Sequence, residues 1–138
     1  MSPVRVAVDT SVAVPLLSKA HVFQPRFSDW AQGQDLWLSG HAAVETLAVL
    51  TRLPGGLALA ALDVIRLLDE TFVGALDLPD TAVAVRTLAR MGITGGATYD
   101  GLVALAAKEH KAILATHDAR ALATYQAVGV AVTLVSPA

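Results

Sequence analysis

Short apolar runs alternate along the chain with longer stretches in which apolar residues recur at helical spacing. The apolar runs cover residues 4–8, 36–38, 72–76, 112–115 and 131–135, and such runs are typical of strands that are covered on both faces. The helical stretches cover residues 12–17, 41–53, 57–70, 81–90, 98–110 and 119–127. Strands that alternate with helices form right-handed βαβ units, so the pattern predicts an α/β fold with a mostly parallel sheet of about five strands.

The stretch 57–70 is apolar on more than one helical face. Leu57, Ala61, Val64 and Leu68 form one stripe, whereas Leu59 and Leu62 lie off it. Two interpretations remain open for this stretch. It is either a well-buried helix or a helix that presents a dimer or partner surface.

The size of the chain is that of one domain. Its 138 residues fall in the range of roughly 100–150 residues in which domains are most common, so we expect a single domain over 1–138. Apolar residues make up 54% and charged residues 16% of the sequence, and the charged share is below the average of about 25%. This excess of apolar residues favours a binding partner or self-association.

Cysteine and charge narrow the possible functions. The absence of cysteine excludes disulfide scaffolds, thiol nucleophiles and cysteine-ligated metal sites. The net charge of −2 gives no global attraction to nucleic acid. No run approaches the ~18 apolar residues of a membrane span, and no signal-peptide pattern precedes Asp9. We therefore expect a soluble, cytoplasmic protein.

Carboxylates follow the predicted strands at one edge of the predicted sheet. In open parallel sheets, ligands bind outside the carboxyl ends of the strands. Asp9 directly follows the first strand, Asp118 follows the fourth, and Asp100 begins the helix that leads into the fourth strand. Glu45 lies in a helix among apolar neighbours, where burial of an unpaired carboxylate costs several kcal/mol.

Each of these carboxylates also has a purely structural interpretation. Asp9, Asp100 and Asp118 lie near helix starts, where carboxylates cap backbone N–H groups, and Glu45 has Arg52 seven residues later on its helical face. As a group they would repel one another and require a cation. Oxygen ligands without histidine or cysteine favour magnesium or manganese, so the four together predict a metal site.

Four segments resemble the motifs of PIN-domain toxins of the VapC type. They are Val8-Asp9-Thr10-Ser11 and the segments 44–54, 99–106 and 113–118, the last of which reads Ile-Leu-Ala-Thr-His-Asp. The resemblance covers nearly the whole chain, in the family's order and spacing. Two positions depart from the common pattern: Pro15 falls within the first helix, and Gly101 follows Asp100 where alanine is more usual.

The resemblance implies a PIN-like α/β/α sandwich and an endoribonuclease. Such enzymes hydrolyse RNA with Mg²⁺ or Mn²⁺ and leave 5′-phosphate and 3′-hydroxyl ends. They act as the toxin of a toxin–antitoxin pair, are inhibited by a small cognate antitoxin, and usually form homodimers. Carried over by motif, the metal-holding quartet is Asp9, Glu45, Asp100 and Asp118, with Glu45 as general base or as a holder of an outer water.

Other residues near these motifs would support the acidic quartet or contact RNA. Thr116 would orient Asp118 or a metal-bound water, and Ser11 or Thr10 would act similarly beside Asp9. Arg120 follows Asp118 closely, and it is either an RNA contact or a member of a structural ion pair.

Three rival functions remain to be weighed. The main alternative is a non-catalytic PIN-like module with a binding or regulatory role, against which the intact quartet argues. A response-regulator receiver needs a late lysine, but none follows Lys111. A phosphatase of the haloacid dehalogenase type needs a second aspartate two residues after Asp9, where this chain has Ser11.

Overall fold

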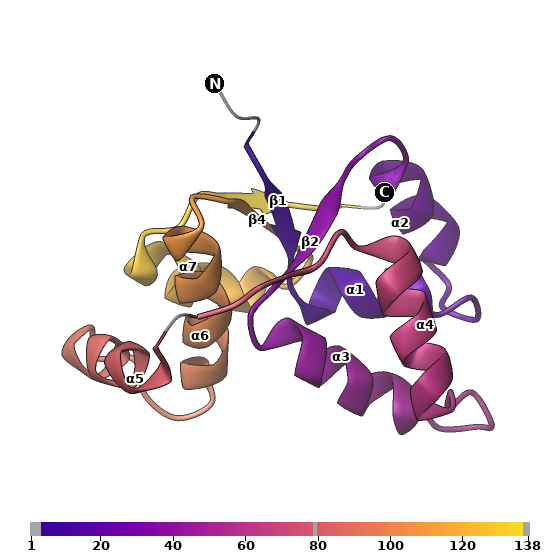
Figure 1. The fold of residues 1–138 in the computed structure, drawn as a ribbon, viewed down its shortest axis with the longest axis horizontal. Helices are drawn as coiled ribbons and strands as arrows, with labels where there is room; N and C mark the ends of the chain where they lie inside the picture. The colour runs from indigo at the N-terminus through magenta and orange to yellow at the C-terminus, as the bar shows by residue number, and fades with distance from the viewer. Residues whose placement is uncertain (1–3, 79, 137–138) are drawn as a thin grey trace.

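A five-stranded parallel sheet forms the centre of the molecule (Figure 1). The computed structural model describes residues 4–78 and 80–136. The strands lie in the order β3-β2-β1-β4-β5, and every neighbouring pair is parallel. They are β1 (Val6–Val8), β2 (Leu36–Ser39), β3 (Ala75–Leu76), β4 (Ile113–Thr116) and β5 (Val132–Leu134). The predicted α/β class with a sheet of five strands is therefore confirmed.

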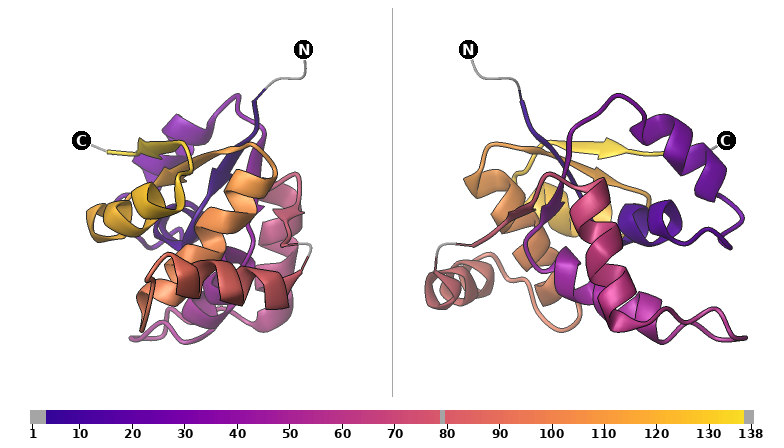
Figure 2. Two further views of the ribbon diagram at one scale, coloured as in Figure 1. Left: turned by 90° about the vertical axis from the view of Figure 1, so that its left-hand side faces the viewer. Right: turned by 45° about the vertical axis from the view of Figure 1, so that its right-hand side comes forward.

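Helices cover both faces of this sheet, which gives three layers (Figures 1 and 2). One layer holds α1 (Thr10–Leu17), α2 (Gln24–Ala31), α3 (Ala42–Thr51) and α4 (Ala61–Thr71). The other holds α5 (Thr81–Arg90), α6 (Ala97–Glu109) and α7 (Leu122–Val128), the last preceded by the 3-10 turn η1 (Ala119–Ala121).

Each layer packs on its own hydrophobic core. Successive strand residues point to opposite faces, so Val8 and Ala115 enter the core of the α1–α4 layer, while Ala7 and Leu114 enter that of the α5–α7 layer. All four of these side chains are fully buried. The uniformly apolar runs of the sequence thus reflect strands covered on both sides.

Helix α2 was not predicted from the pattern of apolar residues. Among its eight residues, Phe27 alone is buried, and Trp30 and Ala31 are only partly buried against the same core, so its apolar face is short. Pro25 lies at its first turn, where the missing N–H group and the fixed φ of proline are tolerated. Pro15 lies inside α1 and is buried, and the helix continues through it to Leu17.

Two predicted boundaries were wrong around α4. The helix begins at Ala61 rather than at residue 57, because the segment before it is a loop in which the Leu59 N–H donates to the Leu50 carbonyl at 2.9 Å. Within α4, Val64 is fully buried but Leu62 is 83% exposed, so the interpretation as a well-buried helix was wrong. The predicted strand 72–76 shortens to two residues, since Phe72 ends α4.

Close packing fixes α6 against the end of β2. The Ser39 hydroxyl donates to the Val103 carbonyl at 2.6 Å. Gly40 has φ +50°, and a Cβ there would lie 2.8 Å from the Cβ of Ala106. Only glycine fits both conditions, so the turn after β2 lets α6 approach the sheet and brings its first turn to the carboxyl edge. Within residues 4–78 and 80–136, no helix is long and apolar enough to cross a bilayer.

Candidate active site

The four acidic residues singled out in the sequence line one small pocket. Its volume is about 80 Å³, and it lies at the carboxyl ends of β1 and β4. The chain runs from β1 to β2 on one side and later reaches β4 on the other, which makes this edge the topological switch point where ligands bind in such sheets. The lining consists of Asp9, Thr10, Ser11, Glu45, Asp100, Val103, Asp118 and Tyr125.

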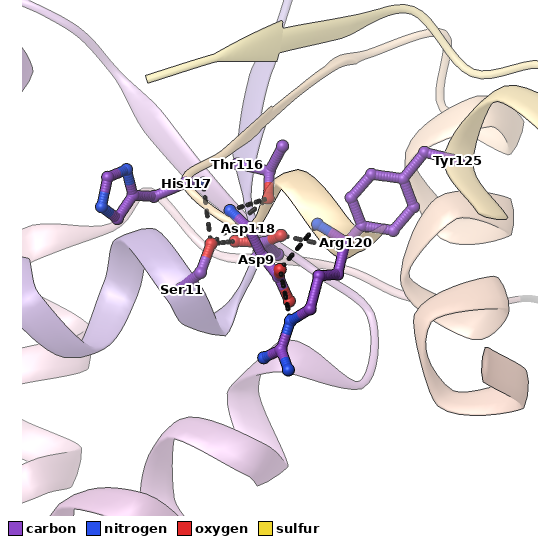
Figure 3. Close-up of polar contacts among 7 residues, drawn as sticks. All are labelled: Asp9, Ser11, Thr116, His117, Asp118, Arg120 and Tyr125. Carbon is purple, nitrogen blue, oxygen red and sulfur yellow. Dashed lines mark hydrogen bonds and ion pairs between the residues drawn. The ribbon is translucent and has the colours of Figure 1, made fainter. Parts of the chain in front are cut away.

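Asp9 is held by two hydroxyl groups and leaves the backbone of α1 uncapped. The residue is 4% exposed and occupies the N-cap position, but its side chain accepts no capping hydrogen bond. Its Oδ1 accepts from the Ser11 hydroxyl at 2.5 Å, and its Oδ2 accepts from the Tyr125 hydroxyl at 2.7 Å (Figure 3). The structural interpretation of Asp9 as a helix cap was therefore wrong.

Asp118 does cap a helical turn. Its Oδ1 accepts from the Arg120 backbone N–H at 3.0 Å, which satisfies the start of η1. The same oxygen lies 3.5 Å from Nε of Arg120, whose side chain is 95% exposed. Arg120 thus forms an ion pair at the pocket mouth (Figure 3), and such an exposed pair contributes little to stability.

The hydroxyl of Thr116 supports Asp118 through the backbone. Thr116 is fully buried, and its Oγ1 accepts from the Asp118 N–H at 3.1 Å. It is also hydrogen bonded to Ser11 at 3.2 Å. Ser11 has a single hydroxyl hydrogen, which goes to Asp9, and it accepts from the His117 N–H at 2.8 Å. Thr116 is therefore the donor to Ser11.

Thr10 contacts Glu45 and not Asp9. Its hydroxyl donates to Oε2 of Glu45 at 3.3 Å. The other oxygen, Oε1, is buried and has no hydrogen-bond partner among residues 4–78 and 80–136. Among the described residues, Glu45 forms no ion pair with Arg52, so the surface-pair interpretation of Glu45 was wrong.

Asp100 shows the mutual repulsion of the four carboxylates. It lies in the first turn of α6 without capping it. Partial burial raises the pKa of Asp100 above its ordinary value, and the charges of Glu45, Asp118 and Asp9 raise it further, against a lowering by Arg120. The three other acidic residues are thus close enough to act on Asp100 electrostatically.

The residues of this pocket suit a hydrated divalent cation. No lysine or arginine belongs to the lining, and a buried carboxylate oxygen without a partner is costly unless something positive or hydrogen-donating meets it. Within the described part of the chain, no group of three or more histidine, cysteine, aspartate or glutamate side chains is placed to hold a metal ion by itself. Magnesium needs only one or two protein carboxylates and retains several waters, so it is the ion that these carboxylates would hold.

Tyr125 is a pocket residue that was not predicted from the sequence. It lies on α7, is 1% exposed, and reaches Asp9 across 116 residues of sequence. Burial raises the pKa of Tyr125 far above its ordinary value, and the charge of Asp9 raises it further; the phenol therefore stays protonated and is the donor. No spacing motif marks such a long-range partner.

His117 points away from the pocket. Its Nδ1 lies 2.8 Å from the Val135 carbonyl, and its ring contacts Phe27 and Phe23 edge-on. Figure 3 shows the ring on the far side of Ser11 from Asp9. The histidine therefore adds no ligand to the carboxylates.

Curated relatives resemble this chain over nearly all of its length. It is 52% identical over 130 residues to Ribonuclease VapC27 of Mycobacterium tuberculosis (strain ATCC 25618 / H37Rv), covering 93% of this chain and 95% of that protein. It is 37% identical over 143 residues to Ribonuclease VapC40 of M. tuberculosis (strain CDC 1551 / Oshkosh), covering 95% and 99%. The resemblance to VapC-type proteins is thereby confirmed.

Solved structures share the fold at lower identity. FitAcB from Neisseria gonorrhoeae is 24% identical with a TM-score of 0.64, covering 96% of this chain and 97% of that one. PAE2754 from Pyrobaculum aerophilum is 20% identical with a TM-score of 0.55, covering 94% and 83%. The sequence profile of the PIN domain matches residues 6–127. From the profile, the relatives and the parallel sheet together, we conclude that the chain belongs to the PIN domain family.

Proposed function

We propose that the protein is a metal-dependent endoribonuclease that hydrolyses RNA phosphodiester bonds as the toxin of a toxin–antitoxin pair. The observation that carries this proposal is the convergence of four carboxylates in one pocket whose lining holds no basic residue. The ribonuclease names of the relatives at 52% and 37% identity support the substrate. Cellular RNA as substrate implies action in the cytoplasm.

Some pocket residues would hold a cation, and others would orient water. Asp9, Asp100 and Asp118 hold Mg²⁺ or Mn²⁺ directly or through water. When bound, the ion lowers the pKa of its water and neutralises charge at the phosphate. Asp9 keeps a fixed orientation because Ser11 and Tyr125 both donate to it.

Glu45 and Arg120 act on water and on the substrate. The unpartnered Oε1 of Glu45 accepts a hydrogen bond from a pocket water, and two roles remain for it: general base or outer-sphere holder. A general base gives the cleavage rate an acidic limb in its pH profile, and loss of that limb in Glu45→Gln identifies this role. Arg120, exposed at the pocket mouth, contacts an RNA phosphate.

Exposed apolar side chains on the surface indicate that the protein has protein partners. On α3 and α4, Val44 is 60% exposed, Leu62 83% and Ile65 43%, and exposed apolar side chains of this kind are typical of protein interfaces. We infer that the chain forms a homodimer and binds a small antitoxin that blocks the pocket. Light scattering of the purified chain, with and without the co-expressed antitoxin, measures both associations.

The decisive experiment is RNA cleavage by the antitoxin-free chain. A pool of structured cellular RNAs is incubated with Mg²⁺, with Mn²⁺ or with excess chelator, and the ends of the products are mapped. The test variant is Asp9→Asn, which keeps the side-chain shape but removes the charge. The matched control is Asp63→Asn on α4, whose side chain is 51% exposed and pairs with Arg66.

The expected result is metal-dependent cleavage that leaves 5′-phosphates, is lost in Asp9→Asn and is retained in Asp63→Asn. Full cleavage by Asp9→Asn would overturn the assignment of the pocket. A folded wild-type chain that neither cleaves RNA nor binds Mn²⁺ would instead identify a non-catalytic PIN-like binding module.

A further inference from the structure

The carboxylate of Asp9 is bound on both oxygens by side-chain hydroxyl groups from opposite layers of the fold. Ser11 belongs to α1 and lies only two residues away along the chain. Tyr125 belongs to α7, in the layer on the other face of the sheet, and donates at 2.7 Å. Figure 3 shows the phenol reaching Asp9 from the side opposite to Ser11. The two bonds together fix the plane of the carboxylate.

This arrangement leaves part of Asp9 available to a ligand. A carboxylate has about four lone-pair positions, two on each oxygen. Each hydroxyl uses one, so one on each oxygen remains. Rotation of the carboxylate about its Cβ–Cγ bond would break both hydrogen bonds at once. The remaining lone pairs are therefore held in a constant direction.

The ring of Tyr125 is itself held firmly. It belongs to the core of the α5–α7 layer together with Leu114, Ala121 and Val128, and it is 1% exposed. The core fixes the ring, so the hydroxyl cannot move without repacking its surroundings. A hydroxyl positioned in this way favours one orientation of its acceptor, as hydrogen bonds to ligating side chains do in metal sites.

We propose that Tyr125 is a positioning residue that orients Asp9 for binding of a divalent cation. The inference rests on the proposed metal-dependent nuclease function and extends it to a residue outside the acidic quartet. The phenol takes no part in the reaction itself. Its effect is on the affinity of the pocket for the cation, because a rotating Asp9 must be ordered again each time that a cation binds.

The test compares Tyr125→Phe with Tyr99→Phe, since the chain has two tyrosines. Tyr99 precedes Asp100 but is 57% exposed and does not line the pocket, so the same atom is removed without touching Asp9. Mn²⁺ binding is measured by calorimetry for the wild type and both variants. RNA cleavage is then measured over a range of Mn²⁺ concentrations.

We expect Tyr125→Phe to weaken Mn²⁺ binding by about 10-fold, the lower end of the effect of such supporting hydrogen bonds. Half-maximal cleavage should shift to higher Mn²⁺ by the same factor, while the rate at saturating Mn²⁺ returns to that of the wild type. Tyr99→Phe should match the wild type in both measurements. The calorimetric stoichiometry reports the fraction of active protein, so affinity is separated from any loss of folding.

Three results would count against the proposal in different ways. An unchanged Mn²⁺ affinity in Tyr125→Phe would overturn it and leave the nuclease assignment standing. A lower cleavage rate at every Mn²⁺ concentration, with unchanged affinity, would show that Tyr125 only supports the fold. Failure of the wild type both to bind Mn²⁺ and to cleave RNA would overturn the proposed function and this inference together.

Discussion

The hydroxyl groups of Ser11 and Thr116 are hydrogen bonded at 3.2 Å across 105 residues of sequence. This bond joins the first turn of α1 to the last residue of β4. Ser11 then donates to Asp9, and Thr116 accepts from the backbone of Asp118. Two carboxylates that belong to different strand ends are thus positioned by one chain of hydroxyl groups.

Replacement of Thr116 by valine should interrupt this series of hydroxyl hydrogen bonds. Thr116 is fully buried, and Thr116→Val removes both the acceptor of the Asp118 N–H and the donor to Ser11. The Asp118 N–H then lacks its acceptor, whereas Ser11 keeps its bonds to Asp9 and His117. We expect a loss of about 1–3 kcal/mol in the free energy of unfolding, measured with urea, and weaker cleavage. Thr116→Ser keeps the hydroxyl and should retain more of the cleavage rate than the valine variant.

Thr46→Val on α3 is the matched control for this change. Thr46 is equally buried, but its hydroxyl has no hydrogen-bond partner. The same substitution there should therefore leave stability unchanged or raise it by about 1 kcal/mol. Equal destabilisation by the two valine variants would contradict the importance of the Ser11–Thr116 bond.

Gly101→Ala should destabilise the packing of α5 on α6. A Cβ at this position would lie 2.6 Å from Cδ2 of Leu88, and Leu88 is 1% exposed, so its side chain has little room to move. We expect a loss of about 1–3 kcal/mol in thermal or urea unfolding. This packing accounts for the presence of glycine at position 101.

A smaller side chain at position 88 should make room for the Cβ that Gly101→Ala adds. Leu88→Val combined with Gly101→Ala should lose less stability than the sum of the two single changes, as in a double-mutant cycle. Gly96→Ala, where a Cβ would meet no atom within 4 Å, is the neutral control. Additive losses at positions 88 and 101 would argue against the contact.

Asp100 should make the metal-free protein less stable as pH rises. Its pKa is raised in the folded state, so the folded chain binds the proton more tightly than the unfolded chain, and stability falls as pH rises through the native pKa. Below the pKa that Asp100 has in the unfolded chain, this loss of stability is absent. Asp100→Asn should therefore raise the melting temperature at neutral pH and flatten its pH dependence between the two pKa values.

Addition of Mn²⁺ should make the wild type more stable than Asp100→Asn. A cation that binds only the folded chain stabilises it by about 2.7 kcal/mol at 100 times its Kd, and this gain needs the ionised Asp100. The wild type should then melt above Asp100→Asn. A wild type whose melting temperature is insensitive to Mn²⁺ would contradict the metal-site assignment.

Arg120→Ala should weaken RNA binding more than it changes the cleavage rate at saturating RNA. Arg120 is 95% exposed, so loss of one phosphate contact should raise KM and reduce the slope of log K against log salt by up to about 0.7–0.9. Arg66→Ala, which removes another exposed arginine paired with an aspartate, is the control. An unchanged salt slope would identify Arg120 as a structural ion-pair partner of Asp118 alone.

The sequence allowed prediction of those features that local patterns determine. The five strands follow from uniformly apolar runs, and Asp9 and Asp118 were found because they come just after strands that end at one edge. Asp100 was found because it begins the helix that leads into the fourth strand, and Glu45 because it is a carboxylate among apolar neighbours. Their convergence in one pocket agrees with that expectation.

Features determined by tertiary contacts could not be predicted in this way. Helix α2 buries one side chain, Phe27, so its local signal is weak. Helix α4 was predicted, but no capping side chain marks its start at Ala61. The role of Tyr125 and the donor direction of Thr116 depend on partners more than 100 residues away. Such contacts are visible only when the chain is folded.

The two separate cores of the molecule have a consequence for how its sequence can vary. Glu45 is carried by a helix of one layer and Asp100 by a helix of the other, so the spacing between these carboxylates depends on how both layers rest on the sheet. Libraries that randomise the buried positions of either core should therefore yield many folded members with altered cation preference. Selection for nuclease activity should then recover correlated changes in the two cores. This is expected even though, of the described residues, only Val103 and Tyr125 belong both to a core and to the pocket lining.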